Sequence, residues 1–240
     1  MYDYLTFQLY GAMASWGEMA PGGVRHSALY PSKSALIGLI AAALGIKREQ
    51  ETEQHALANS LVFGVKVLSD GTLLRDFHTS QVPGQERKRL YATREQELNN
   101  SPKLNTILST RDYRVDAYAV IAVSVKSDGP YSLAQIQQAL LSPKFTLYLG
   151  RKSCPLALPL HPQLVNTQGV RSALDSFDTD VFLQSTGGQW LNAKQNYYAW
   201  EGEGHDISAK MTSVRQDMPI SRKRWQFAKR SEHLNYGGNA

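Results

Sequence analysis

The sequence predicts an α+β protein whose elements follow one another as strand, helix, strand, strand, helix and strand. Three observations predict this class. Asp116–Lys126 is a nearly continuous apolar run, which is typical of a central strand. Ser34–Ile46 repeats apolar residues on nearly every face of a helix, which predicts a buried helix. Ser132 can cap a second helical segment, LAQIQQALL, which we expect to end at Pro143.

The first strand is predicted at Tyr2–Tyr10, where apolar and polar residues alternate. The segment that follows, Gly11–Ser34, is rich in glycine and contains two prolines, so we expect an irregular loop there. Ser32 or Ser34 can cap the buried helix, and Gly45 is expected to end it.

A second helix is expected from about Gln50 to Ser60, and the strand Leu61–Leu68 comes directly after it. The turn signal Asp70-Gly71 then leads to Leu73–Thr79, which can form a further strand. Residues 79–114 are polar and rich in charge, and we interpret them as an arm rather than as part of the core. An insertion of about 30 polar residues in a compact domain is usually functional or disordered.

Lys144–Leu149 is predicted to be the last strand of the unit. Without the arm, the order βαββαβ is the ferredoxin-like arrangement, a four-stranded sheet with helices on one face and a common RNA-binding scaffold. The pattern weakens after Pro159, and residues 185–204 are expected to hold short strands joined by loops. Seven basic residues lie between positions 207 and 233, where Lys223–Arg230 is predicted to be a strand with one aromatic and one basic face.

The charge balance suits a polyanionic partner without requiring one, because 26 Lys and Arg residues against 21 Asp and Glu give a net charge of +5. Cys154 is the only cysteine, so no internal disulfide is expected. The N-terminus lacks the basic region and cleavage site of a secretory signal. The most apolar segment, Ser34–Ile46, spans thirteen residues and is too short to cross a bilayer. We therefore expect a cytoplasmic protein without a membrane partner.

The stretch Leu147–Leu156, LYLGRKSCPL, is the first candidate for an anion site. Gly150 lets backbone N–H groups approach a ligand, and Arg151 and Lys152 supply positive charge. Ser153 can donate a hydrogen bond to a phosphate oxygen. A surface loop with two solvated cations would explain the same residues equally simply.

The Gly11–Ser34 loop is the second candidate, because it combines Trp16 with Arg25 and Lys33. Bases of a single strand stack on aromatic side chains while cations meet the phosphates. Trp16 could instead fill the edge of the core. If both candidates are correct, the two loops could act on one RNA segment.

Most enzyme signatures are missing from the sequence. It contains no GxGxxG, GxxxxGK[ST], HExxH or CxxC, and Cys154 has no neighbouring base that would make it a nucleophile. The six histidines show no metal-ligand spacing, so we expect neither a metal nor a cofactor. His78, close to Arg75, is the best candidate for a general base in metal-free RNA cleavage.

Four blocks occur in one order along the chain: the first strand with GAMASWG, then YPSKSALIGLIAAALGI, LLRDFHT and LYLGRKSCPL. A looser agreement follows in MPISRKRWQFAKR. With these blocks the chain resembles the CasD family, the Cascade subunits of subtype I-E CRISPR systems, which belong to the repeat-associated RNA-binding (RAMP) superfamily. The resemblance covers roughly residues 1–160.

The resemblance implies a ferredoxin-like RAMP domain at residues 1–160 with a thumb at about 79–114, and a β-rich extension at residues 161–240 packed on the same body. It also implies a non-catalytic RNA-binding subunit of a ribonucleoprotein complex in antiviral defence. Such a subunit holds the 5′ handle of the crRNA between the backbone subunit CasC and the large PAM-recognising subunit CasA. Target DNA is reached only through the complex, and guide cleavage belongs to a separate subunit, CasE.

The resemblance implies handle contacts, as a group, for the residues that match the family's blocks, and we add Arg111 from the thumb. The resulting set of RNA-binding candidates is Gly11, Trp16, Gly17, Arg25, Ser32, Lys33, Ser34, Arg75, His78, Arg111, Gly150, Arg151, Lys152 and Ser153. The thumb matches the family poorly, so the choice of contact residues within Arg87–Arg94 and Arg111–Arg114 stays open.

The alternative function is a metal-independent endoribonuclease that processes CRISPR repeat RNA, as in subtype I-C relatives, which use a Tyr, a Lys and a His. The candidates here are Tyr30 or Tyr91, Lys33 or Lys88, and His78, and they form no compact motif in the sequence. A free-standing RNA chaperone is a third, more distant possibility.

Overall fold

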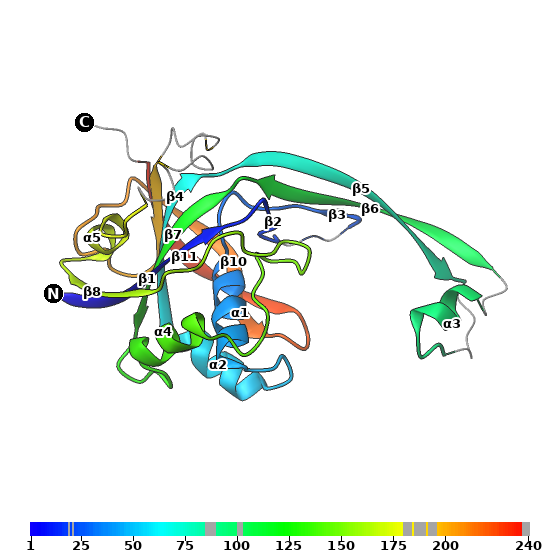
Figure 1. Ribbon diagram of the computed structural model, residues 1–240, viewed down its shortest axis with the longest axis horizontal. Helices are drawn as coiled ribbons and strands as arrows, with labels where there is room; N and C mark the ends of the chain where they lie inside the picture. Colours follow the sequence, from blue (N-terminus) through cyan, green and yellow to red (C-terminus); the bar gives the residue numbers. More distant parts are fainter. Residues whose placement is uncertain are drawn as a thin grey trace.

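The chain builds one large antiparallel sheet from which a long two-stranded arm projects (Figure 1). The computed structural model describes residues 1–18, 20, 22–84, 90–99, 103–179, 184, 191 and 196–236. The elements are β1 (Tyr2–Tyr10), β2 (Met13–Ala14), β3 (Val24–Arg25), α1 (Lys33–Leu44), α2 (Glu51–Ser60), β4 (Leu61–Ser69), β5 (Thr72–Pro83), α3 (Arg94–Asn99), β6 (Leu104–Val115), β7 (Tyr118–Val125), α4 (Leu133–Leu141), β8 (Gln163–Thr167), α5 (Val170–Asp175), β9 (Tyr197–Trp200), β10 (Met211–Ser221) and β11 (Gln226–Tyr236). The protein is therefore of the α+β class that the sequence predicts.

The main sheet has the strand order β10-β11-β9-β4-β7-β1-β8. The apolar strand β7 lies in its interior and pairs with β4 on one side and β1 on the other. In register, Val123 of β7 faces both Leu5 and Phe63. The predicted central strand is thus confirmed, because its continuous apolar run is buried on both faces.

The predicted helix boundaries are confirmed at α1 and α4. Ser32 caps α1 by accepting a hydrogen bond from the backbone of Ala35, and Gly45 ends the helix in the left-handed conformation at φ 81°. Ser132 and Gln135 form a capping box at the start of α4. None of the helices in the described residues combines the length and the apolar character needed to span a bilayer.

Helices cover both faces of the main sheet. Leu5, Phe7 and Leu9 of β1 point into a core shared with α1, α2 and α4. Tyr4, on the opposite face, packs in a second cluster with α5. Figure 1 shows α5 on one side of the sheet and α1 and α2 on the other.

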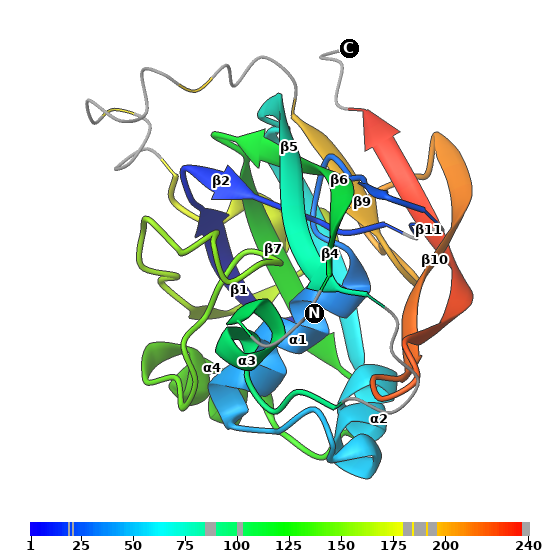
Figure 2. The same cartoon turned by 90° about the vertical axis from the view of Figure 1, so that its right-hand side faces the viewer.

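The arm consists of β5 and β6, which pair in antiparallel register from Thr72 opposite Val115 to Pro83 opposite Leu104. The helix α3 lies at its far end (Figure 1). Figure 2, viewed along the arm, shows the short strand β2 beside its base. The short strand β3 pairs in parallel with β6. The arm is therefore a continuous hairpin that includes Leu73–Thr79, where the sequence predicts a separate strand before a polar insertion.

The prediction of a last strand at Lys144–Leu149 is wrong. The backbone N–H groups of Lys144 and Phe145 donate to the last turn of α1, to Ala43 and Ala42 at 3.0 and 3.1 Å, so they are not available to a sheet. The strand that pairs with β1 is β8, about fifteen residues later.

The C-terminal region also differs from its prediction. Residues 222–225 form a turn, and the strand β11 begins only at Gln226. Together with β9 and β10, this strand extends the main sheet beyond β4. Within residues 185–204, where short strands are predicted, residues 185–190 and 192–195 lie outside the described residues. Of the remainder, Tyr197–Trp200 form β9.

Candidate nucleic-acid interface

The base of the arm is organised around Asp112, a buried carboxylate on β6. Arg75 of β5 donates to its two oxygens at 2.9 and 3.0 Å, and Nδ1 of His26 lies 3.0 Å from Oδ2. The hydrogen bonds from Arg75 lower the pKa of Asp112 to about 2, against the opposing effect of burial. Asp112 therefore stays charged and ties the arm to the loop that carries His26.

The two loops singled out in the sequence lie against each other at this base. The backbone N–H of Ser15 donates to Leu149 at 3.0 Å, and its hydroxyl donates to the carbonyl of Asp112 at 3.1 Å. Gly150 has φ +84°, and a Cβ on it would lie 1.9 Å from the carbonyl oxygen of Ser15. Gly150 is thus required for close packing of the two loops, a role that differs from the predicted approach of backbone to a phosphate.

Three arginines converge on one side of the arm base, and we call Arg25, Arg111 and Arg151 the arginine cluster. Arg25 of β3 is directly opposite Arg111 of β6 in register, so both side chains point to the same face. Arg151 reaches the carbonyl of Arg25 at 3.5 Å, and its guanidinium lies 4.8 Å from the ring of Tyr113. Tyr113 is two residues beyond Arg111 on the same strand and therefore shares its face.

In the described part of the chain, no ion pair neutralises the arginine cluster, although Asp76 lies opposite Arg111 in register. Among the described residues, no carboxylate lies within 4.0 Å of any of its three guanidinium groups. In that same part of the chain, Nη1 of Arg151 is buried without a hydrogen-bond partner. Like charges that face each other across a strand pair are unfavourable unless an anion lies between them. Because a guanidinium binds phosphate oxygens through two parallel N–H groups, this face suits a polynucleotide backbone.

Lys152 and Ser153 are exposed at the tip of the neighbouring turn, next to Arg151, and their side chains are accessible to a ligand. Cys154, by contrast, is buried, and burial raises the pKa of its thiol. Gly17 forms an isolated bridge with Ser27 within the first loop, and a Cβ on it would meet no atom within 4 Å. The turn therefore offers one further cation and one hydroxyl to the arginine cluster.

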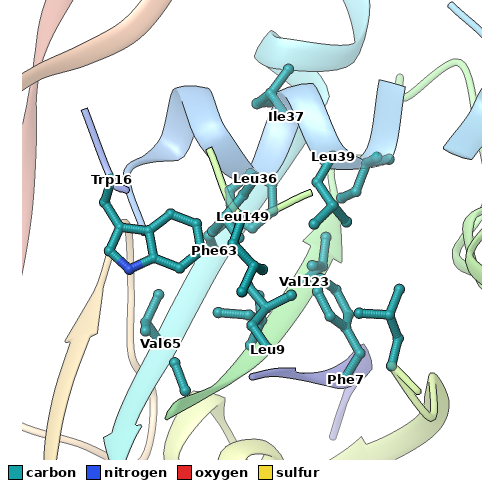
Figure 3. Packing of buried hydrophobic residues seen from close by; sticks show 14 of the residues in the cluster. Phe7, Leu9, Trp16, Leu36, Ile37, Leu39, Phe63, Val65, Val123 and Leu149 are labelled. Carbon is teal, nitrogen blue, oxygen red and sulfur yellow. The ribbon is translucent and has the colours of Figure 1, made fainter. Parts of the chain in front are cut away.

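The stacking role suggested for Trp16 is not compatible with its position. The side chain is 3% exposed and packs into the core beside Leu36, Phe63 and Leu149 (Figure 3). An indole in that position cannot offer a face to a base without opening the core. Trp16 instead anchors the first loop to the body.

Lys33 is also a structural residue rather than an exposed phosphate contact. It is 6% exposed, and its ammonium donates to the carbonyl of Leu61 at 2.8 Å and to Glu201 at 2.8 and 2.9 Å. Burial lowers the pKa of Lys33, and the charge of Glu201 opposes that shift. Because its ammonium already donates to three protein oxygens, Lys33 has no N–H group left for a phosphate.

Three smaller candidates serve the packing of the loops. Ser32 is buried as the cap of α1, and its hydroxyl lies 3.0 Å from that of Ser34. A Cβ on Gly11 would lie 2.6 Å from the carbonyl oxygen of Pro155. These contacts give each of the three residues a structural role that does not require contact with RNA.

Farther out on the arm, His78 is half-exposed, and its Nδ1 lies 3.6 Å from Asp76. Asp76 is opposite Arg111 in register, so His78, two positions further, is on the face of the arginine cluster. Arg94 forms an ion pair with Glu97 at the end of the arm, at 2.6 Å. Residues 85–89, which include the candidate Lys88, lie outside the described residues.

Two basic residues near the C-terminus, Arg215 and Arg230, have carboxylate partners that sequence reasoning missed. Arg230 donates to Asp217 at 2.6 and 2.9 Å and to Glu232 at 2.6 Å, and Arg215 lies 3.3 Å from Glu232. Burial disfavours the charge on Arg230, but its hydrogen bonds with Asp217 more than offset this and raise its pKa. The hydroxyl of Tyr30 completes the network by donating to Glu232 at 2.5 Å.

Comparison with known proteins decides the family. A family model described as CRISPR-associated protein (Cas_Cas5) matches residues 4–232. The chain belongs to this family. The CRISPR system Cascade subunit CasD of Escherichia coli (strain K12) is 30% identical to it over 247 residues, which cover 99% of this chain and 98% of CasD. The resemblance found in the sequence is confirmed.

Two solved structures have a similar fold. A chain from a structure described as a CRISPR RNA-guided surveillance complex is 26% identical, with a TM-score of 0.62 over 97% of this chain and 89% of that chain. A second structure, described as the crystal structure of a Cas protein, is 24% identical, with a TM-score of 0.64 over 97% of this chain and 94% of that chain, and it bears on the fold alone.

Proposed function

We propose that the protein is a subunit of a Cascade-type CRISPR complex that binds the 5′ handle of the crRNA through the arginine cluster and the adjacent Lys152. The observation that carries this proposal is the convergence of Arg25, Arg111 and Arg151 without carboxylate partners among the described residues. Membership of the Cas5 family and the similarity to CasD support the same conclusion. On this proposal Gly150 and Asp112 position the cluster, while Arg25, Arg151 and Lys152 contact the phosphates.

We further propose that β1, α1, β4, β7, α4 and β8 form a ferredoxin-like RAMP unit, with β5 and β6 as its thumb. The adjacent order β4-β7-β1-β8 within the sheet supports this assignment. The unit then runs through β8, some seven residues beyond the boundary at residue 160. The C-terminal strands β9, β10 and β11 are the β-rich extension on the same sheet.

The arm is the proposed contact with the backbone subunit CasC. Phe77 is 66% exposed, and Ile107 and Leu108 are also exposed on the hairpin. Apolar side chains on a projecting element are typical of protein interfaces. In this arrangement CasA lies on the other side of the handle, target DNA is reached through the complex, and the assembly works in the cytoplasm.

We propose that the subunit is not catalytic. Two members of the candidate set for RNA cleavage are committed elsewhere, because Tyr30 donates to Glu232 and Lys33 is paired with Glu201. His78 is on the arm beside Asp76. Purified protein incubated with repeat RNA and EDTA should leave the RNA intact. Specific cleavage that disappears in His78→Ala would establish the endoribonuclease instead.

Binding of a labelled 5′-handle RNA tests the proposed function. We expect Arg151→Ala combined with Lys152→Ala to weaken binding by about tenfold, because two charge-assisted phosphate contacts are lost. Lys126→Ala combined with Lys210→Ala removes two exposed lysines elsewhere and should leave the affinity within about twofold. Equal losses in the two double variants would contradict a localised site.

A further inference from the structure

The turn between β10 and β11 exposes a tryptophan that the proposed function does not use. Trp225 is 58% exposed and has φ +54°, a conformation rare for a bulky residue. Its ring stacks near Phe227 at 6.0 Å with an interplanar angle of 29°, and the guanidinium of Arg48 lies 5.0 Å from the ring. We call residues 221–227 with Lys47 and Arg48 the Trp225 turn.

The Trp225 turn is strongly basic. Its five cations are Lys47, Arg48, Arg222, Lys223 and Arg224. Glu51 of α2 accepts hydrogen bonds from the hydroxyl of Ser221 and from the backbone N–H of Lys223. Glu51 thus holds the turn in place through its backbone, while the side chains of Lys223 and Arg224 remain exposed.

Arg222 adds a second, independent sign that this surface accepts an anion. Its side chain is partly buried, and its guanidinium donates to the carbonyl of Ser34 at the start of α1. In the part of the chain that the structure describes, no carboxylate lies within 4.0 Å of it. Burial and the nearby charge of Arg48 lower its pKa to about 10, so it is still charged at neutral pH. A partly buried cation without a counter-charge is unfavourable, and a bound anion would relieve that cost.

The ligand must match both an aromatic ring and a group of cations. Unpaired bases stack on tryptophan, and the phosphates that link them are spaced to meet lysine and arginine side chains. A duplex hides the faces of its bases within the helix, so it could use the cations but not the indole. An acidic peptide would also use the cations but would gain less from the ring.

We infer that the Trp225 turn is a second binding site for single-stranded nucleic acid, separate from the arginine cluster. One base stacks on Trp225, and the neighbouring phosphates contact Lys223 and Arg224. This inference does not rest on the proposed handle site, because none of these residues belongs to it. RNA and DNA single strands share the required chemistry, and the experiment below distinguishes them.

Tryptophan fluorescence reports directly on this site in the full chain. Trp225 is exposed, whereas Trp16 and Trp200 are each 3% exposed. The fourth tryptophan, Trp190, lies outside the described residues, so the comparison with Trp225→Phe is what assigns the quenching to Trp225. The probes are a uridine RNA octamer and a thymidine DNA octamer. We expect quenching by at least one of them, and loss of most of it in Trp225→Phe. Quenching by RNA alone would indicate a guide-derived ligand, and quenching by both would indicate a general single-strand site.

Affinity measured independently by anisotropy of a labelled octamer completes the test. Trp225→Ala should weaken binding about tenfold, and Trp225→Phe, which keeps an aromatic face, by no more than about threefold. Lys223→Ala combined with Arg224→Ala should lower the slope of log affinity against log salt by about 1.4. Lys126→Ala combined with Lys210→Ala should leave the slope unchanged.

The inference is overturned if neither octamer quenches the fluorescence, or if Trp225→Ala binds as tightly as the wild type. Tight binding of a protein partner that Trp225→Ala abolishes, without octamer binding, would likewise overturn it. The variant Arg151→Ala/Lys152→Ala separates the two sites. It should weaken handle binding and keep the quenching of Trp225. A negative result at the arginine cluster therefore does not decide whether the Trp225 turn binds a single strand, and the reverse also holds.

Discussion

The cations of this protein fall into two groups that differ in their surroundings rather than in residue type. Lys33 is buried and paired with Glu201, and the half-buried Arg230 is paired with Asp217 and Glu232. Arg25 is exposed and Arg151 is half-buried at the arm base, and no carboxylate among the described residues lies within ion-pair distance of either. The comparison teaches that a cation in a basic chain contributes to the fold when a carboxylate neutralises it, and is available to a phosphate when none does.

The largest expected effect is on the buried group. Glu201→Ala removes the counter-charge of Lys33 and the acceptor of the Phe63 backbone N–H. Because the ammonium remains buried and unpaired, we expect the free energy of unfolding to fall by about 3–5 kcal/mol. Urea denaturation measures this change.

A matched control for that variant is Glu203→Ala, two residues away. The side chain of Glu203 is 88% exposed, so the free energy of unfolding should change by less than about 0.5 kcal/mol. A loss below about 1 kcal/mol in Glu201→Ala would mean that Lys33 is not dependent on this carboxylate, and the distinction between the two groups would be weaker.

The next largest effect is expected for Gly150, which lets the loop that carries Arg151 pack against Ser15. Gly150→Ala places a Cβ against the carbonyl of Ser15 and requires a left-handed backbone conformation. We expect a loss of at least about 2 kcal/mol in the free energy of unfolding and weaker handle binding, because the two loops separate. Gly17→Ala is the control, since a Cβ there meets nothing within 4 Å. Normal stability and handle binding in Gly150→Ala would show that the loop contact is not needed.

A smaller effect is the acid sensitivity of the arm base. The folded-state pKa of Asp112 is about 2, below the value of about 3.9 for an unfolded chain. The stabilisation by Arg75 is therefore complete above roughly pH 4 and is lost as the pH falls through about 2. Melting temperatures measured over this window should fall more steeply for the wild type than for Asp112→Asn. Parallel curves would mean that the ion pair between Asp112 and Arg75 does not stabilise the folded state in this pH range.

Local features of the fold could be predicted from the sequence, whereas distant pairings could not. The caps of α1 and α4 depend on residues three positions apart, and the apolar run of β7 is visible without any partner. The position of β8 was missed because the strand is short and mostly polar, and only its pairing with β1 defines it.

The same limit applies to the site. The sequence identified Arg25, Arg111 and Arg151 as candidates by residue type and by resemblance. It offered no signal that Asp112 joins Arg75 and His26, which are 37 and 86 positions away. It also could not show that Lys33 is buried against a carboxylate 168 positions later. Charge is visible in a sequence, but its neutralisation depends on tertiary contacts.

The central claim is that the cations of the arm base, and not basic residues in general, hold a single-stranded backbone. The salt dependence of handle binding tests it most directly. Arg151→Ala combined with Lys152→Ala should lower the slope of log affinity against log salt by about 1.4, since each phosphate contact on a single strand contributes about 0.7. The control variant Lys126→Ala combined with Lys210→Ala should keep the wild-type slope. An unchanged affinity and slope in the first variant would contradict the claim.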